Sequence, residues 1–191
     1  CALVAALLLA ALPAAAAPQA VTPQPLPVDV LNQLLASDGA REDYFGHSVA
    51  VDGDTAVVGA YFDDVGANTN QGSAYVYVRS GGVWTQQQQL TASDGAATDE
   101  FGYSVSVSGD TVVVGARQND VGANTNQGSA YVFVRVGGVW TQQQQLTASD
   151  GAAFDYFGYS ASVSGDTVVV GAWQNDIGAN ADQGSAYVFV R

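Results

Sequence analysis

The sequence predicts an all-β protein built from β-propeller blades, each a sheet of four antiparallel strands. The main observation is a repeat: Phe45-Gly46, Phe101-Gly102 and Phe157-Gly158 are spaced 56 residues apart, and a period near this length is typical of propeller blades or repeat arrays. A second observation is the alternation of apolar and small polar residues within each unit, which is the signature of a strand. A third is that no amphipathic helix pattern of useful length follows residue 36.

The second copy of the unit illustrates the first two expected strands. Residues 101–108 alternate, and the side chains expected on one face of this strand are Phe101, Tyr103, Val105 and Val107. Glycine and serine occupy the other face, where small side chains allow a neighbouring strand to approach closely. After a tight turn at Gly109, Thr111–Ala116 is apolar on both faces, which predicts a strand covered on both sides.

Two further strands complete the unit. A polar loop leads to residues 130–135, again apolar on both faces, and a Gly137-Gly138 turn leads back into residues 139–148. This last segment is rich in glutamine, which suits the exposed edge of a sheet because hydrated side chains discourage further strand pairing. A disordered low-complexity tract is the alternative for such glutamines, but the flanking tryptophan and leucine favour a strand.

The start of the chain has the features of a secretory signal peptide. Residues 1–20 contain an apolar run followed by small residues, and we expect cleavage between about Ala15 and Ala20. A membrane-spanning helix is the alternative, but it needs about 20 apolar residues, and Pro13 interrupts the run. The chain is therefore expected to be secreted, or displayed at the cell surface.

Two further regions follow the signal peptide. Residues 21–29 form a Pro-rich linker, and residues 30–191 form the propeller segment. The repeats cover about 38–93, 94–149 and 150–191, the last one incomplete. Because three blades fall short of the usual ~4–8, we expect an open segment of a larger propeller, in a product that continues with more repeats or in a fragment that self-associates. The apolar residues expected in water on the open blade face are Val112, Val114, Tyr131 and Phe133.

Charge and cysteine usage exclude several classes of partner and site. The chain has 5 Lys plus Arg against 18 Asp plus Glu, a net charge of −13, so nucleic acids and anionic membrane surfaces would be repelled. No membrane insertion is expected after signal removal. Cys1 is the only cysteine, which rules out an internal disulfide and any multi-cysteine metal site.

At its Phe-Gly and Gly-Ala pairs the chain resembles the FG-GAP repeat family, the blades of integrin alpha-subunit propellers and of many secreted bacterial proteins. Each copy has Phe-Gly-x-Ser, then Gly-Asp-Thr, Val-Val-Gly-Ala and Gly-Ser-Ala-Tyr-Val. The resemblance implies that the Phe-Gly strand is innermost in each blade, and that Val30–Ala36 is a strand that closes the ring. Tyr61, Arg117 and Trp173 replace the proline of the family motif.

The resemblance does not carry over the calcium site that some integrin blades have. Their Asp-rich loop is reduced here to short turns such as Ser108-Gly109-Asp110, which offer too few oxygens for the 6–8 that calcium takes. The loop containing Asp120, Asn124 and Asn126 has alternating oxygen side chains that suit a hard cation, although these residues are also ordinary loop formers. We therefore expect no cofactor and assign no metal site.

No residue pattern predicts catalysis, so the chain is not expected to be an enzyme. His47 is the only histidine, and tyrosine takes its place in the other copies, which favours a half-buried aromatic position. Aspartates that recur in every copy, such as Asp43 and Asp99, favour a shared turn or cap. A glycosidase would need two particular carboxylates placed across one bond.

A ligand-binding surface is predicted from the positions at which the copies differ. Differences between the first two copies gather at residues 41–44, before the Phe-Gly strand, and at 61–63, after the Gly-Ala pair, and both connections should lie at one end of the blades. Free drift of exposed loops is the alternative. The candidate ligand-binding residues are Tyr61, Phe62, Arg117, Gln118, Trp173 and Gln174.

The function expected from the sequence is a non-catalytic binding or adhesion module that recognises a protein or glycan through one propeller face. The two alternatives are an accessory propeller of a larger secreted hydrolase and a purely structural spacer. Tyr61, Arg117 and Trp173 are the expected anchors, because these side-chain types often dominate binding hot spots.

Overall fold

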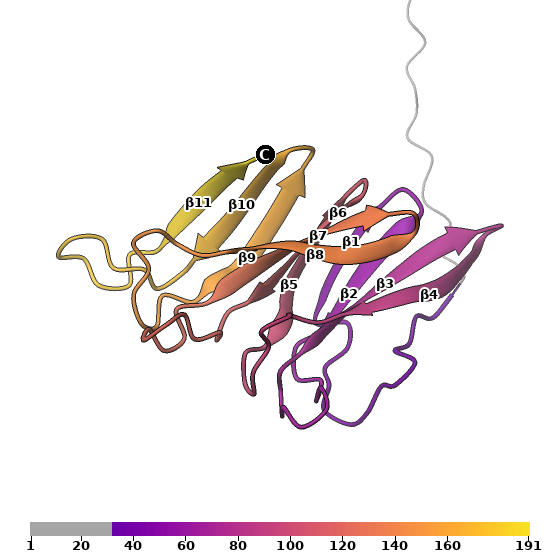
Figure 1. The fold of residues 1–191 in the computed structure, drawn as a ribbon, viewed down its shortest axis with the longest axis horizontal. Coiled ribbons are helices and arrows are strands. Elements are labelled where there is room, and N and C mark those ends of the chain that lie inside the picture. The colour runs from indigo at the N-terminus through magenta and orange to yellow at the C-terminus, as the bar shows by residue number, and fades with distance from the viewer. Residues whose placement is uncertain (1–31) are drawn as a thin grey trace, which may run out of the picture. The chain divides into compact units, whose positions relative to one another are not determined.

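The structure, a computed structural model, describes residues 32–191, and these form three antiparallel sheets and no helix (Figure 1). The predicted signal peptide and linker lie outside the described residues. The strands are β1 Ser48–Asp52, β2 Thr55–Ala60, β3 Ser73–Ser80, β4 Val83–Leu90, β5 Phe101–Ser108, β6 Thr111–Ala116, β7 Ser129–Val136, β8 Val139–Leu146, β9 Phe157–Ser164, β10 Thr167–Ala172 and β11 Ser185–Val190. We call β1–β4, β5–β8 and β9–β11 the first, second and third blades. The expectation of all-β blades is confirmed.

Within each complete blade the strands follow one another in chain order, so that β1 or β5 is one edge and the glutamine-rich β4 or β8 is the other. The predicted bounds of Thr111–Ala116 are confirmed, and β7 and β8 differ from the prediction by one or two residues. Glycines at the two hairpin turns have positive φ, 56° at Gly109 and 60° at Gly137, a conformation that costs glycine little.

We call the first strands of the three blades, β1, β5 and β9, the inner strands. The inner strand β5 departs from simple alternation near its start. Phe101 pairs with Ala116 and Ser104 with Gly115, so the two intervening residues bulge out of the ladder. Gly102 allows this because its φ is 92°. Phe101 is buried in the core, but Tyr103 is turned away from it, so the prediction that Tyr103 shares the face of Val105 and Val107 was wrong.

Neighbouring blades approach most closely along their inner strands, as the small residues predicted. The Ser104 hydroxyl donates a hydrogen bond of 2.8 Å to the carbonyl oxygen of Gly158, and Ser48 makes the equivalent 2.7 Å bond to Gly102. A Cβ atom at Gly115 would overlap the Gly158 carbonyl oxygen. The chain therefore needs glycine and serine here for backbone-to-side-chain contact between blades.

The apolar core lies between the blades. One cluster joins Val57 and Val76 of the first blade to Val112 and Phe133 of the second, and another joins the opposite face of the second blade to the third. The prediction that Val112, Val114, Tyr131 and Phe133 face water was wrong, because the first blade covers them. Exposed valines lie instead on the third blade, at Val169, Val188 and Val190, and on β1 of the first blade, at Val49 and Val51.

The first blade differs from the others at its start. β1 begins at Ser48, three residues later than the Phe-Gly pattern predicted. The predicted closing strand 30–36 is described only from residue 32, and residues 32–36 form no strand. They instead lie against the first blade, where Leu34 packs beside Tyr75 and Tyr77 and the Leu35 carbonyl accepts a 2.7 Å hydrogen bond from Tyr77. No strand in the described part of the chain is placed to pair with this segment.

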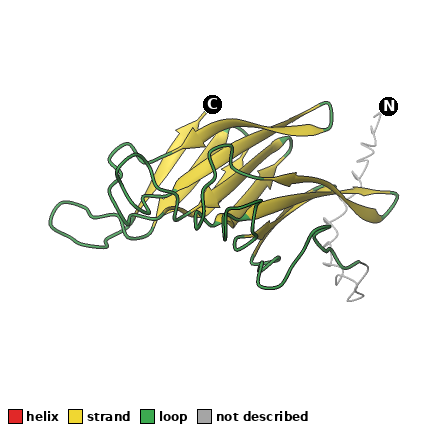
Figure 2. Ribbon diagram, turned by 60° about the horizontal axis from the view of Figure 1, so that its bottom comes forward, coloured by secondary structure: helices red, strands yellow, loops and turns green. Residues whose placement is uncertain are grey.

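The two ends of the blades are unlike (Figure 2). Short turns lie at one end, which we call the turn end, and the long loops that follow β2, β4, β6, β8 and β10 lie at the other, which we call the loop end. Within residues 32–191 there is no helix long and apolar enough to cross a membrane.

Candidate functional site

The loops before each inner strand and after each Gly-Ala pair meet at the loop end, as the sequence predicted. The amide of Phe62 donates to the Asp43 carbonyl at 3.4 Å, and that of Gln118 to the Asp99 carbonyl at 3.2 Å. The aspartates also order these turns, since the Asp99 carboxylate accepts a 2.7 Å hydrogen bond from the Ala96 amide. The expected turn role of the repeated aspartates is confirmed.

The residues before the inner strands have a left-handed backbone. Tyr44, Glu100 and Tyr156 have φ values of 53°, 58° and 53°, an uncommon conformation for residues other than glycine. Sparsely populated backbone conformations cost free energy and cluster at binding sites and switch regions. Here they occur at positions where the blades also differ in sequence, and they bring each side chain beside the residue that follows the Gly-Ala pair.

Aromatic side chains form a continuous band across the loop end of all three blades. We call this band the aromatic belt; its members are Tyr44, His47, Tyr61, Phe62, Tyr103, Arg117, Phe154, Tyr156, Tyr159 and Trp173. Ring centroids are 5.4 Å apart between Tyr61 and Tyr103 and 5.1 Å apart between Tyr103 and Tyr159, which joins the blades. The belt therefore crosses two blade boundaries without a break.

The first and third blades contribute aromatic pairs to the belt. Tyr44 stacks on Tyr61 with centroids 5.5 Å apart and ring planes 16° apart. Tyr156 and Trp173 occupy the same positions in the third blade, with centroids 6.3 Å apart. About half of the surface of Tyr44 and of Trp173 is exposed, 52% and 50%, so each pair has one ring that is largely open to solvent.

The second blade replaces this aromatic pair with an ion pair. Arg117 Nε lies 2.6 Å from Glu100 Oε2, and the side chains are 23% and 5% exposed. The guanidinium also lies 4.0 Å from the ring centroid of Tyr103, within the range of a cation–π contact. Burial would lower the pKa of Arg117, but the hydrogen bond and charge of Glu100 outweigh it and raise that pKa above its ordinary value. Burial is also the main cause that raises the pKa of Tyr103 to about 12.

The six residues predicted to contact ligand all lie at the loop end, but their surroundings differ. Tyr61, Phe62 and Trp173 are part of the belt, while Arg117 is already held by Glu100. Gln118 also donates to Glu100, and Gln174 donates to Asp182 at 3.2 Å. Trp173 is therefore the most accessible of the three belt rings, while Tyr61 and Phe62 are half-buried. Ligand contact by all six residues stays a prediction.

Sequence reasoning missed several members of the belt. Tyr103 was expected on the strand face of Phe101, Val105 and Val107, because a period-two pattern cannot show a bulge, and Tyr159 was not named as a binding residue. His47 is exposed rather than half-buried and lies 4.5 Å from Tyr61 and 4.8 Å from Tyr103, centroid to centroid. The paired exchange of Tyr44 and Tyr61 for Glu100 and Arg117 was the available signal, since an aromatic pair is replaced by opposite charges.

The Asp-Asn loops are ordered by their own hydrogen bonds. Asp120 Oδ1 accepts a 2.7 Å bond from the Asn126 amide, and Asn124 donates to Gln127 and to the Gly151 carbonyl. Within residues 32–191 no group of three His, Cys, Asp or Glu side chains is placed to hold a metal ion. Cation binding by these loops gains no support from their geometry.

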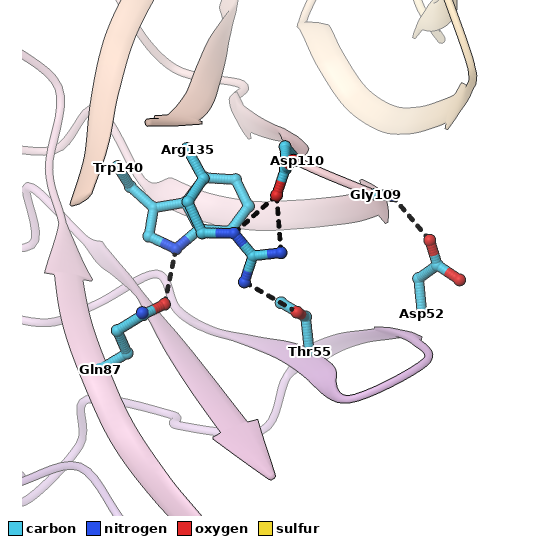
Figure 3. A network of polar contacts seen from close by, with 7 residues as sticks. All are labelled: Asp52, Thr55, Gln87, Gly109, Asp110, Arg135 and Trp140. Atoms are coloured by element: carbon cyan, nitrogen blue, oxygen red, sulfur yellow. Dashed lines mark hydrogen bonds and ion pairs between the residues drawn. The ribbon is translucent and has the colours of Figure 1, made fainter. Parts of the chain in front are cut away.

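The turn end carries a polar network between the first and second blades (Figure 3). Arg135 pairs with Asp110 at 2.6 Å and donates to Thr55 of the first blade at 3.2 Å, while Trp140 Nε1 donates to Gln87 at 2.9 Å. A cavity of about 440 Å³ lies beside this network, lined partly by Arg79. Arg79 lies in strand β3 and Arg135 in strand β7. Each pairs with an aspartate of its own blade, Asp54 and Asp110.

Comparison with known proteins agrees with the repeat. A model described as the FG-GAP repeat matches residues 30–77, 84–133 and 140–189. A search of curated protein sequences finds no match. Among solved structures, the computationally designed Ika4 protein is similar, with 16% identity and a TM-score of 0.36 over 83% of this chain and 98% of that one.

Proposed function

Because the chain belongs to the FG-GAP repeat family, we propose that its blades form a non-catalytic binding module whose ligand contacts the aromatic belt. The observation that carries this proposal is the half-exposed aromatic surface that continues across three blades at one end. Exposed contiguous apolar surface is a mark of interaction sites. Aromatic residues and arginine are also the side chains that most often dominate binding hot spots.

The proposal of a non-catalytic role rests on how the polar groups of the belt are engaged. Its buried carboxylate, Glu100, is bonded to both Arg117 and Gln118, so it is committed to holding the loop. His47 lies beside tyrosine rings. The FG-GAP propeller fold is also generally non-catalytic. An accessory module of a larger hydrolase would use the same belt to bind substrate. The binding experiment described below therefore tests the belt under that alternative as well.

We also propose that the protein acts outside the cell or at its surface. FG-GAP repeats occur in extracellular and cell-surface proteins, and the apolar run of residues 1–17 ends in small residues that suit a signal peptidase. N-terminal sequencing of the exported protein should find a start between about Ala15 and Ala20. A mature chain beginning upstream of Leu9, or one kept in the cytosol, would contradict the proposal.

The binding role is tested with an array that carries polysaccharides together with basic and acidic peptides. The purified chain, fluorescently labelled, should bind at least one member, and the double variant Tyr61→Ala/Trp173→Ala should bind it at least about tenfold more weakly, about 1.4 kcal/mol. The matched control is Ser108→Ala/Ser164→Ala at the turn end, which should bind normally. Binding that is lost only in the turn-end variant, or no binding at all, would overturn the proposed function.

A further inference from the structure

Resting on the proposed function, we propose that the ligand of the aromatic belt is a polysaccharide without acidic groups, bound along its length against exposed ring faces. Three features of the loop end support this ligand: the exposed rings, the filled spaces between neighbouring rings, and the charges around the belt. Each feature excludes a different class of ligand.

The most exposed rings of the belt lie in the first and third blades. Tyr44, Phe154 and Trp173 are 52%, 53% and 50% exposed, and they come from the first and third blades. A sugar ring has an apolar face of C–H groups, and aromatic rings combine a large apolar face with a specific geometry of contact. Exposed rings on separate blades suit successive units of one chain better than a single small ligand.

The protein's own side chains fill the spaces between neighbouring rings of the belt. We call each such space, above the aromatic residue two positions after the Phe of the Phe-Gly pair, a slot. In the second blade the Arg117 guanidinium occupies the slot above Tyr103. At the equivalent position in the first blade the Tyr61 ring lies 4.5 Å from His47, and in the third the Trp173 ring lies 5.3 Å from Tyr159. A long lysine or arginine side chain from a partner would need such a slot, so the filled slots favour a flat ligand over a basic peptide.

The charge of the loop end excludes acidic ligands. Only two arginines lie at this end, Arg41 and Arg117, and both are paired with glutamates. The thirteen carboxylates of the same end are Asp38, Glu42, Asp43, Asp63, Asp64, Asp94, Asp99, Glu100, Asp120, Asp150, Asp155, Asp176 and Asp182. A polysaccharide bearing carboxylates or sulfates would be repelled by this excess.

The same carboxylates provide acceptors for a neutral or amino-bearing polysaccharide. Asp64 and Asp176 are exposed at this end, and each accepts one loop amide on a single oxygen. Their second oxygens can accept hydrogen bonds from hydroxyl and ammonium groups alike. The turn end lacks this excess, since Asp54, Asp110 and Asp166 are each paired with an arginine.

The test uses two double variants, which we call exchanges, that leave the net charge unchanged. One introduces the ion pair into the third blade, and the other removes it from the second. Tyr156→Glu/Trp173→Arg gives the third blade the pair of the second, and removes two rings without changing the net charge. Glu100→Tyr/Arg117→Tyr does the reverse and adds two rings. Binding is measured on the full chain, by calorimetry or on an array, with neutral, amino-bearing and acidic polysaccharides and an oligo-arginine peptide as probes.

We expect binding to at least one neutral or amino-bearing polysaccharide and to none of the acidic ones. The first exchange should weaken it at least about fivefold, and the second should strengthen it or leave it unchanged, with both variants keeping a cooperative unfolding transition. Binding to oligo-arginine alone through the belt would overturn this inference and leave the proposed function intact. Polysaccharide binding that the first exchange does not weaken would overturn it as well, because the two rings removed from the third blade would then make no contribution to the binding.

Discussion

The second and third blades have nearly the same sequence, but only the second lies between two neighbours. β6 and β10 are both Thr-Val-Val-Val-Gly-Ala, yet the middle valine of β6, Val113, is fully buried and the equivalent Val169 is 36% exposed. The difference is larger in the next strand, where Val188 of β11 is 64% exposed and its equivalent Val132 packs against the core. Burial of a blade is therefore decided by its neighbours, as expected for repeats that contact only adjacent units.

The largest expected difference between the two blades is at the glycine that ends the second strand. Gly115→Ala should destabilise the protein by about 3 kcal/mol, because its Cβ would overlap the Gly158 carbonyl of the next blade. Gly171→Ala should cost under about 1 kcal/mol, since the new Cβ would meet the movable Ser160 hydroxyl first. Urea unfolding of the two variants measures the difference in their free energies of unfolding. Equal losses of stability would mean that the second and third blades can move apart to accommodate the new Cβ atom.

The valines provide a second, smaller test of the same comparison. Val113→Ala should destabilise the protein by about 2 kcal/mol and Val169→Ala by about 0.5 kcal/mol, because the first side chain is fully buried and the second is 36% exposed. Both losses are read from the urea midpoint at constant slope. A loss at Val169 as large as that at Val113 would show that another surface covers the third blade in solution.

The first blade differs from the other two in one buried polar contact. Asn119 and Asn175 donate to Asp99 and Asp155 at 3.1 and 3.0 Å, but the first blade has Asp63 in place of the asparagine. Asp63→Asn should therefore stabilise the protein by about 1 kcal/mol at pH 7 by giving Asp43 a donor. Asn119→Asp is the matched reverse change and should destabilise it by a similar amount. If Asp63→Asn does not raise the free energy of unfolding, the carboxylates of Asp43 and Asp63 already have sufficient hydrogen-bond donors.

The effect of Asp63 should depend on pH. Burial is the first cause that raises its pKa above the ordinary 3.8, and nearby Asp43 and Asp38 raise it further, against hydrogen bonds from Ser73 and Tyr75. A raised pKa means that the folded state holds the proton more tightly, so stability from this group is present below about pH 3.8 and is lost as pH rises through the folded pKa. The gain from Asp63→Asn should accordingly grow with pH above 3.8, and a constant gain would contradict this.

The last difference concerns the strand that the second blade has and the described third blade lacks. Gln145 Nε2 on β8 lies within hydrogen-bond distance of Asn119, Ser129 and Tyr131, whereas Asn175 Oδ1 and Ser185 Oγ are buried without a partner in the described residues. A synthetic peptide of residues 139–147 should add to β11. At about five times its Kd it should stabilise the chain by about 1 kcal/mol.

The control for this experiment is the same peptide carrying Gln145→Leu. It keeps the strand and its apolar residues but cannot donate to Asn175 and Ser185. Thermal unfolding with each peptide should show the smaller shift for the leucine peptide. Equal shifts would mean that backbone pairing alone attracts the peptide.

The sequence by itself determined the repeat, the four strands of the first two blades, the glutamine-rich edge and the meeting of the variable loops at one end. These features follow from local patterns: period-two alternation, glycine at turns, and connections of fixed length. These features were predicted well because each copy has the same local residue pattern. The predicted bounds of Thr111–Ala116, for example, agree with the structure.

Only the tertiary structure decided the membership of the aromatic belt and the open face. The bulge at Gly102 turns Tyr103 out of the core, and no alternation pattern contains a register shift. The pairing of Arg117 with Glu100, and of Trp140 with Gln87, joins residues far apart in the chain. Identical strands acquire different burial because the area removed from water depends on which blade packs against them, which is a property of the assembled blades and not of the local sequence.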